Sequence, residues 1–183
     1  MNGQDDTTRQ TYDRLFDPLR AVSVWDVQIP GFVDRDSRVP LFTPWGNTVY
    51  LALQEGGYLR MDSVGGLGNL ALRMVDEVEP PEDPADAEDE FALSSCGAHF
   101  LGDDTLTQRI TGIRYVLSGP ADLEFGTVRC IEFQFQYEQR LFVDPSYHWG
   151  IRLQGAGAFE RWIQETRERP ESSGPPREYG WTA

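Results

Sequence analysis

Closely spaced strand patterns in the second half of the chain constrain the fold more than any other feature of this sequence. Apolar residues recur with the period of a strand in four segments, which are 107–117, 126–137, 141–143 and 150–153. Residues typical of turns separate these segments at 118–120, 138–139 and 144–145. Because connections this short join antiparallel neighbours, the pattern predicts an antiparallel meander sheet or a half-barrel.

The longest of these segments, 126–137, sorts its side chains onto two faces. One face carries Ile131, Phe133, Phe135 and Tyr137. The other face carries Cys130, Glu132, Gln134 and Gln136. Successive side chains of a strand point to opposite faces, so we expect the first set in the core and the second set, Glu132 included, on an exposed face of the sheet.

The first half of the chain adds further strands. Alternating apolar residues on both sides of Glu55-Gly56-Gly57 predict a hairpin over 48–54 and 58–61. Residues 22–29 predict a short strand with a register break near Trp25, and the prolines and glycines of 30–46 predict an irregular loop. The segment 67–78 fits a helix or a strand, and the flanking hairpins favour the strand.

Helical spacing occurs near the two ends of the chain. One helical face is formed by Tyr12, Leu15, Phe16 and Leu19, although Pro18 weakens the last turn. Between 157 and 169, a second helical face is formed by Phe159, Trp162 and Ile163. The sequence therefore predicts one β-rich α+β domain over residues 1–169, with an N-terminal and a C-terminal helix packed on the sheet, and a flexible tail over 170–183.

An acidic, proline-rich segment lies between the two halves. Residues 76–90 read DEVEPPEDPADAEDE and contain nine acids and no base. This composition predicts a solvated loop within the domain. The whole chain has a formal net charge of −14, and its basic residues are all Arg, since the sequence contains no Lys. The absence of Lys suits the codon bias of a GC-rich bacterial genome, and a salt-loving host would favour it too.

The charge also sets the class of partner. A strongly acidic chain repels DNA, RNA and anionic membranes unless it carries a local basic patch. The arginines between 161 and 169 alternate with glutamates, which are Glu160, Glu165 and Glu168. The sequence thus predicts no direct nucleic-acid binding and no membrane association, and it favours a basic protein partner. The polar start of the chain and its two cysteines predict a cytoplasmic protein with free thiols.

The weak candidates for chemistry are the four thiol and imidazole side chains, Cys96, His99, Cys130 and His148. Together they would suit tetrahedral zinc, and Cys96 with His148 as its base would suit a thiol nucleophile. Only Cys96 and His99 are close in sequence, whereas zinc motifs bring close pairs on both sides. We therefore expect no metal, no cofactor and no catalytic residue, and keep a small zinc- or thiol-dependent enzyme as the alternative.

Residues 66–71 read GLGNLA and fit the G-x-G-x-x-A pattern of dinucleotide-binding loops. Such loops join a strand to a helix within a parallel sheet. Because hairpins are predicted on both sides of this segment, we favour a glycine-rich turn between two strands.

Three rings lie together in the turn region 144–150, those of Tyr147, His148 and Trp149. Exposed aromatic side chains are frequent centres of protein interfaces. Alternatively, Tyr147 and Trp149 fold back over the end of the sheet and complete its packing. The sequence leaves both alternatives open, and we include the two residues among the candidate contacts.

These observations predict a non-enzymatic, acidic binding protein. In composition the chain is similar to immunity proteins that neutralise bacterial toxins, and this similarity implies an inhibitor of a basic protein partner such as a toxin. The predicted partner-binding residues are Glu79, Glu82, Asp83, Asp86, Glu88, Asp89, Glu132, Tyr147 and Trp149. A small-ligand-binding β-barrel is a further alternative, because the sequence does not distinguish a cavity from a packed core.

Overall fold

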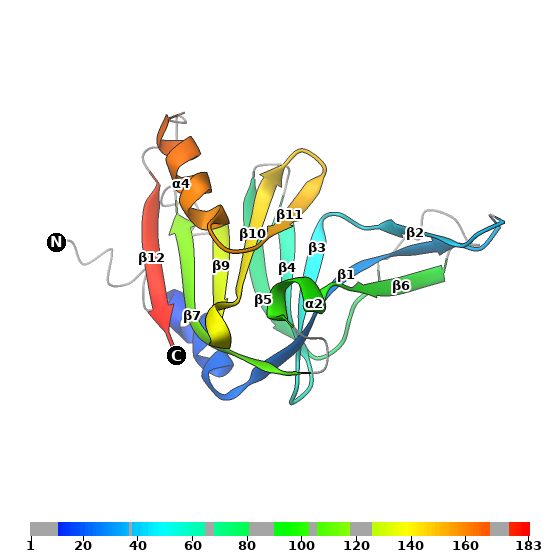
Figure 1. Cartoon of the computed structure of the whole chain (residues 1–183), viewed down its shortest axis with the longest axis horizontal. Coiled ribbons are helices and arrows are strands. Elements are labelled where there is room, and N and C mark those ends of the chain that lie inside the picture. The colour runs from blue at the N-terminus through cyan, green and yellow to red at the C-terminus, as the bar shows by residue number, and fades with distance from the viewer. Residues whose placement is uncertain are drawn as a thin grey trace.

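The computed structural model describes residues 11–36, 38–64, 68–80, 90–102, 106–117, 126–168 and 176–183. The described strands form one open, antiparallel, 12-stranded sheet (Figure 1). The prediction of a β-rich, antiparallel fold is therefore confirmed.

The strands follow one another closely along the chain. In chain order they are β1 (Ser23–Asp34), β2 (Leu41–Pro44), β3 (Thr48–Leu53), β4 (Tyr58–Val64), β5 (Asn69–Val75), β6 (Glu90–Ser95), β7 (Gln108–Leu117), β8 (Thr127–Val128), β9 (Cys130–Phe135), β10 (Arg140–Tyr147), β11 (Gly150–Gln154) and β12 (Arg177–Thr182). The helical segments are η1 (Asp17–Ala21), α2 (Gly97–Leu101), η2 (Gln136–Glu138) and α4 (Ala158–Glu168), and residues 11–16 are also helical. None of the helices in the described ranges is both long and apolar enough to cross a membrane.

β1 connects two lobes of the sheet, because it belongs to the first lobe and also pairs with β7 of the second. The first lobe contains β1 to β6 and β8, and the second contains β7 and β9 to β12. The lobes meet at a short pairing in which Val24 of β1 lies opposite Gln108 of β7. The N-terminal half of β1 then pairs with β3, and its C-terminal half pairs with β2 on one side and β6 on the other.

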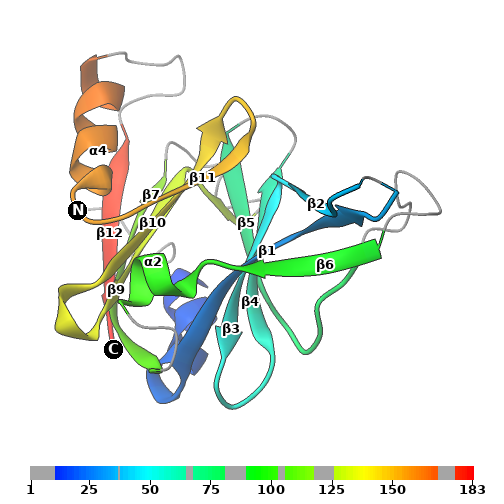
Figure 2. The same cartoon turned by 45° about the vertical axis from the view of Figure 1, so that its right-hand side comes forward.

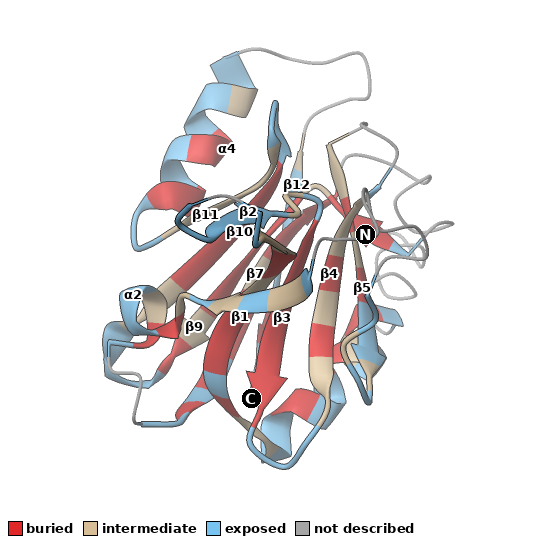
Figure 3. Cartoon of the chain, turned by 90° about the vertical axis from the view of Figure 1, so that its right-hand side faces the viewer, coloured by how far each residue is buried: buried red, intermediate tan, exposed pale blue. Residues whose placement is uncertain are grey.

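The main core contains side chains from both lobes. Figure 3 shows the buried residues on the strands of the sheet. Leu51 and Met61 come from the first lobe, and Ile131 and Phe133 come from the second. Four further rings, those of Tyr12, Phe16, Tyr115 and Trp181, contact one another within this cluster. Each large apolar side chain that leaves water contributes about 1.5–3 kcal/mol, so this shared cluster is the main force that holds the two lobes together.

The other face of the second lobe is not exposed. Phe159, Trp162 and Ile163 of α4 form a second buried cluster with Cys130, Phe142 and Val116 of the strands beneath. Glu132, which we expected on an exposed face, is only 1% accessible. That prediction is wrong because strand alternation distinguishes two faces of a sheet but does not tell whether a helix covers the second one.

β9 is shorter than predicted. It ends at Phe135, and Tyr137, which we expected in the core, is 80% exposed. Tyr137 and Glu138 have φ angles of 56° and 63°, the left-handed conformation that a two-residue hairpin turn requires at both central positions. Non-glycine residues adopt it at a cost of about 1 kcal/mol each or more, and the turn predicted at 138–139 lies one residue earlier in the chain.

Three other segments differ from the sequence-based expectation. β10 continues through Asp144 and Pro145, where a turn was predicted, and the chain turns instead at residues 148–149. Part of the predicted loop 30–46 belongs to β1 and β2. Within the predicted flexible tail, residues 177–182 form β12, which pairs with β7 and places Trp181 in the core.

Several local predictions are confirmed. β3 and β4 form the predicted hairpin, and the segment 67–78 contains a strand, β5. The pairing of β1 with β3 shifts register between Val24 and Asp26, at the break expected near Trp25. These features depend on residues close together in sequence, which is why pattern alone located them.

Candidate interaction surface

The C-terminal half of β1, from Gln28 to Asp34, forms with β2 and β6 a three-stranded extension that we call the wing. Figures 1 and 2 show the wing projecting away from the rest of the molecule. All four residues of β2 are exposed, and Leu41 is 58% accessible. Val39, Phe42 and Leu93 are also large, exposed apolar side chains. Exposed apolar residues gathered on one projecting element are typical of an interaction site.

Cross-strand contacts hold this single layer together. The rings of Phe32 and Phe91 lie opposite each other on β1 and β6, with centroids 6.3 Å apart in an edge-to-face arrangement. On the other face, Phe42 covers Gly31, where a Cβ atom would lie only 2.5 Å from Phe42 Cζ. Aromatic cross-strand pairs contribute about 0.2–1 kcal/mol each, which allows the wing to keep its shape while its outer surface stays open.

The base of the wing is fixed by a buried carboxylate. Asp26 accepts hydrogen bonds from Ser95 Oγ at 2.8 Å, from the Gly97 amide at 3.0 Å and from Gln28 Nε2 at 3.0 Å. These contacts tie β1 to the end of β6 and the start of α2. A Cβ atom at Gly97 would lie 2.5 Å from Asp26 Oδ1, so only glycine fits this junction.

The tip of the β10–β11 hairpin lies beside the wing base. The Ile151 amide donates to the Gly46 carbonyl, in the connection between β2 and β3, at 2.6 Å. Trp149 is 75% exposed and Tyr147 is partly exposed, so the alternative in which both rings fold back over the sheet is wrong for Trp149. A backbone hydrogen bond thus joins the hairpin, which carries the exposed Trp149, to the base of the wing.

Tyr147 is held in place from below by an ion pair. Asp144 is fully buried and accepts a hydrogen bond from Arg152 Nη2 at 2.7 Å. The Arg152 guanidinium in turn lies 5.3 Å from the centre of the Tyr147 ring. The neighbouring rings of His148 and Trp149 contact edge to face, with centroids 4.6 Å apart.

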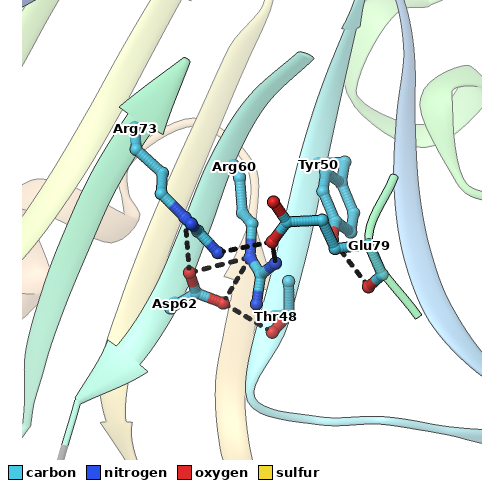
Figure 4. Close-up of polar contacts among 6 residues, drawn as sticks. All are labelled: Thr48, Tyr50, Arg60, Asp62, Arg73 and Glu79. Atoms are coloured by element: carbon cyan, nitrogen blue, oxygen red, sulfur yellow. Dashed lines mark hydrogen bonds and ion pairs between the residues drawn. The ribbon is translucent and has the colours of Figure 1, made fainter. Parts of the chain in front are cut away.

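Glu79, one of the predicted partner-binding residues, is paired within the protein (Figure 4). Its carboxylate accepts hydrogen bonds from Arg60 Nη1 at 2.5 Å and from Arg73 Nη2 at 2.8 Å. Arg60 and Arg73 are cross-strand neighbours on β4 and β5, and Asp62 also pairs with both. Glu79 therefore offsets the repulsion between two like charges and fixes the start of the acidic segment on the outer face of the first lobe.

Glu132 has a similar internal role in the second lobe. It accepts hydrogen bonds from Arg114 Nε at 3.0 Å and Nη2 at 2.7 Å, and the same guanidinium reaches Glu160 of α4 at 2.6 Å. This hydrogen bond lowers the pKa of Glu160, and the Arg114 guanidinium lies 4.1 Å from the Phe159 ring centre. The arrangement joins α4 to the sheet and leaves Glu132 inaccessible to a partner.

The other predicted acidic contacts lie outside the described residues. They are Glu82, Asp83, Asp86, Glu88 and Asp89. The described residues on either side show where this stretch begins and ends. Glu79 pairs with Arg60 on the outer face of the first lobe, and Glu90, whose carboxylate pairs with Arg35, is the first residue of β6. The acidic segment is therefore directly continuous with β6.

The four thiol and imidazole side chains do not form one site. Cys130 lies beneath α4, whereas Cys96 packs against the main core at the wing base; His99 is in α2, and His148 is at the hairpin tip. Among the described residues, no group of three or more Cys, His, Asp or Glu side chains is placed to hold a metal ion. Burial and the nearby Asp26 raise the pKa of Cys96 to about 11, so its thiol stays protonated at neutral pH and donates to the Val27 carbonyl.

The glycine-rich segment 66–71 does not lead into a helix. Residues 69–71 of this segment belong to β5, which pairs antiparallel with β4 and places Asn69 opposite Val64, while residues 66 and 67 lie outside the described residues. Gly68 has a φ of 67°, in the left-handed region that favours glycine. A dinucleotide-binding loop needs a helix at this point, so a strand beginning at Asn69 does not fit that motif.

A pocket of about 500 Å³ lies between α4 and the strands β7 and β12. Its apolar side chains include Phe159 and Ile163, and its charged rim contains Arg114, Arg167 and Glu178. Arg167 and Glu178 pair with each other at 2.8 Å. The pocket lies on the outer face of the second lobe, whereas a ligand-binding barrel would place it among the inward-facing side chains of the core.

Comparison with known proteins gives no relative, since no family model, no curated protein and no solved structure matches this chain. The function is therefore argued from geometry. Sequence reasoning missed the exposed apolar residues of the wing, including Leu41, Phe42 and Leu93. The available signal was the short apolar run of residues 91–93 directly after the acidic segment, which has the composition of a strand.

Proposed function

We propose that this protein is a non-enzymatic binding protein whose wing, together with the neighbouring hairpin tip, engages a basic protein partner. The observation that carries the proposal is the exposure of large apolar side chains on a projecting, single-layered element. Leu41, Phe42 and Leu93 from the wing are joined by Trp149 from the hairpin. A Trp at the centre of an interface often contributes much of the binding energy, and apolar contacts around it exclude water.

The charge of the chain favours a basic partner. The formal net charge is −14, and nine acids lie in the segment that enters the wing. Long-range attraction raises association rates by factors of about 10 to 1,000, and salt screens this attraction. The apolar wing then provides the short-range contacts. An inhibitor of a basic bacterial toxin fits this combination, in keeping with the compositional similarity to immunity proteins.

The test is affinity capture from a host-cell lysate at low and high salt, with two variants run beside the wild type. The double variant Leu41→Ser with Trp149→Ser removes two apolar anchors. The control is Tyr137→Ser, which changes an equally exposed ring at the opposite end of β10, about 25 Å away along an eight-residue strand.

The proposal predicts that one basic protein is retained stoichiometrically by the wild type and by Tyr137→Ser, is released by salt, and is lost from the double variant. Retention of that protein by all three forms would show that the wing is not the binding surface. Retention of no basic protein by the wild type would contradict the proposed function itself.

A further inference from the structure

We propose that the partner binds the wing by adding an extended segment, basic and partly apolar, to the free edge of β6. This inference rests on the proposed function and specifies its geometry. It follows from the direction in which each backbone amide of the wing points, and from the different residues that occupy its two edges.

Two hydrogen bonds fix the pattern of the wing. The Cys96 amide donates to the Val27 carbonyl at 2.8 Å, and the Trp45 amide donates to the Pro30 carbonyl at 2.7 Å. In an antiparallel ladder, hydrogen-bonded and non-hydrogen-bonded pairs alternate. With the observed registers, the backbone groups of residues 90, 92 and 94 face β1, whereas those of Phe91, Leu93 and Ser95 face outward.

The edge of β2 is closed to a further strand. By the same alternation, the backbone amide and carbonyl positions of Phe42 and Pro44 point away from β1, toward the free edge of β2. A further proline, Pro40, directly precedes the strand. Proline has no amide hydrogen, so Phe42 offers the one outward amide within β2. Proline at an edge is a common protection against strand addition.

The edge of β6 has no comparable protection. Its residues 90–95 include no Pro and no basic residue, and in the described part of the chain β6 pairs with β1 alone. Three successive outward amides, at Phe91, Leu93 and Ser95, therefore present a regular row of donors and acceptors. Recognition through such a row is the mode known as β-strand addition.

Side chains and charge identify the incoming strand. Phe91 and Leu93 point to the same face as Phe32, which offers apolar contacts to alternate side chains of an added strand. Glu90, the first residue of β6, is exposed, and the chain as a whole has a formal net charge of −14, so an incoming basic strand is favoured. A second copy of this chain is a poor occupant because each copy carries a formal charge of −14, and the two would repel each other.

The experiment is residue-resolved hydrogen exchange of the full chain, with and without a short peptide in which Arg and Val alternate. Without the peptide, we expect the amides of Phe91, Leu93 and Ser95 to exchange rapidly and those of Ala92 and Ser94 to be protected by β1. With the peptide, we expect protection of the three outward amides. A matched peptide with N-methylated backbone amides keeps charge and side chains, and should bind at least tenfold more weakly.

A pair of protein variants provides an independent readout. Leu93→Pro removes one outward amide and leaves the inward amides of Ala92 and Ser94, whose protection reports that the wing is still folded. Leu93→Ala is the control that removes the side chain but keeps the amide. We expect the proline variant to lose peptide binding at least tenfold, and the alanine variant to lose only a few-fold.

Equal binding of the normal and N-methylated peptides, or no binding of either, would overturn strand addition at β6. Protection of the three amides in the free protein, together with a dimeric mass, would also overturn it and identify a second copy as the occupant. None of these results alters the capture experiment, in which the proposed function fails only if no basic protein depends on the wing.

Discussion

The wing and the outer face of the second lobe are both sheet surfaces, but only one of them is covered. On the second lobe, Phe142 packs edge to face against Phe159 of α4, with ring centroids 6.0 Å apart. On the wing, Phe42 covers a glycine and remains partly open to solvent. Similar residue types therefore stabilise the fold in one region and remain available for binding in the other.

Acidic residues differ in the same way between the two regions. Glu132, beneath α4, is buried and paired with Arg114, so it is part of the internal structure. Glu90, at the start of β6, is exposed and pairs with the exposed Arg35. Because exposed ion pairs are weak, a partner can replace the contact between Glu90 and Arg35 at little cost in free energy. Glu132 cannot pair with a partner unless α4 first moves away from the sheet.

The largest effect expected from this comparison concerns the two phenylalanines. Phe142→Ala should lower the free energy of unfolding by about 3–5 kcal/mol, because it leaves a cavity between α4 and the sheet. Phe42→Ala should lower it by less than about 1 kcal/mol, because that ring is exposed in the native state. Chemical denaturation followed by tryptophan fluorescence measures both. Equal losses in the free energy of unfolding would mean that Phe42 on the wing is packed as tightly as Phe142 beneath α4.

A smaller effect is expected for the paired carboxylates. Glu132→Ala should cost about 2 kcal/mol, because it leaves the partly buried Arg114 without its main acceptor. Glu132→Gln is the matched control, since an amide oxygen still accepts from the guanidinium. Glu79→Ala should cost at most about 1 kcal/mol, since Glu79 and Arg73 are half exposed and the more buried Arg60 keeps Asp62 as an acceptor. A larger loss of stability from Glu79→Ala than from Glu132→Ala would contradict the expectation that the buried carboxylate contributes more to folding.

The smallest effect is a difference in thiol reactivity with pH. The pKa of Cys96 is about 11, so labelling of the folded protein should be slow at neutral pH and accelerate toward pH 11 as thiolate forms. Cys130 is fully buried and should react only after unfolding. The variants Cys96→Ser and Cys130→Ser separate the two rates. Equal rates in the folded state would show that α4 does not seal the second lobe.

The same pKa predicts a stability change in alkali. An exposed thiol titrates near pH 9, so between pH 9 and about pH 11 the unfolded chain loses a proton that the folded protein keeps at Cys96. The stabilisation is present below pH 9 and is lost as the pH rises. Wild type should therefore lose stability more steeply across this window than Cys96→Ser, and parallel curves would contradict the buried position of this thiol.

Local patterns were sufficient to predict much of the fold. The β3–β4 hairpin, the strand β5 and the amphipathic α4 each depend on residues adjacent in sequence. The wing depends instead on pairing between β1 and β6, which are far apart in the chain. Pro30 and Gly31 suggested a loop, yet both lie within β1. The backbone of Pro30 faces Trp45, in the connection between β2 and β3, so the missing proline amide removes only one hydrogen bond between neighbouring strands.

The candidate site was predictable only in part. The exposed Trp149 was among the expected contacts, because a ring in a turn is recognisable from sequence. Glu79 and Glu132 were expected on an interaction surface, but their pairing with Arg60, Arg73 and Arg114 depends on cross-strand register, which a single strand pattern does not contain. The acidic charge favours a basic partner as an expectation from sequence, whereas the exposure of apolar side chains on the wing became visible only in the fold.

The most direct test of the central claim is a hydrogen-exchange footprint of the full chain bound to the basic protein retained in the capture experiment. We predict that new protection falls on β2, β6 and the tip of the β10–β11 hairpin, with no change in α4. A footprint over α4 and the pocket beside it, with the wing unchanged, would contradict the claim that the uncovered part of the sheet is the binding surface.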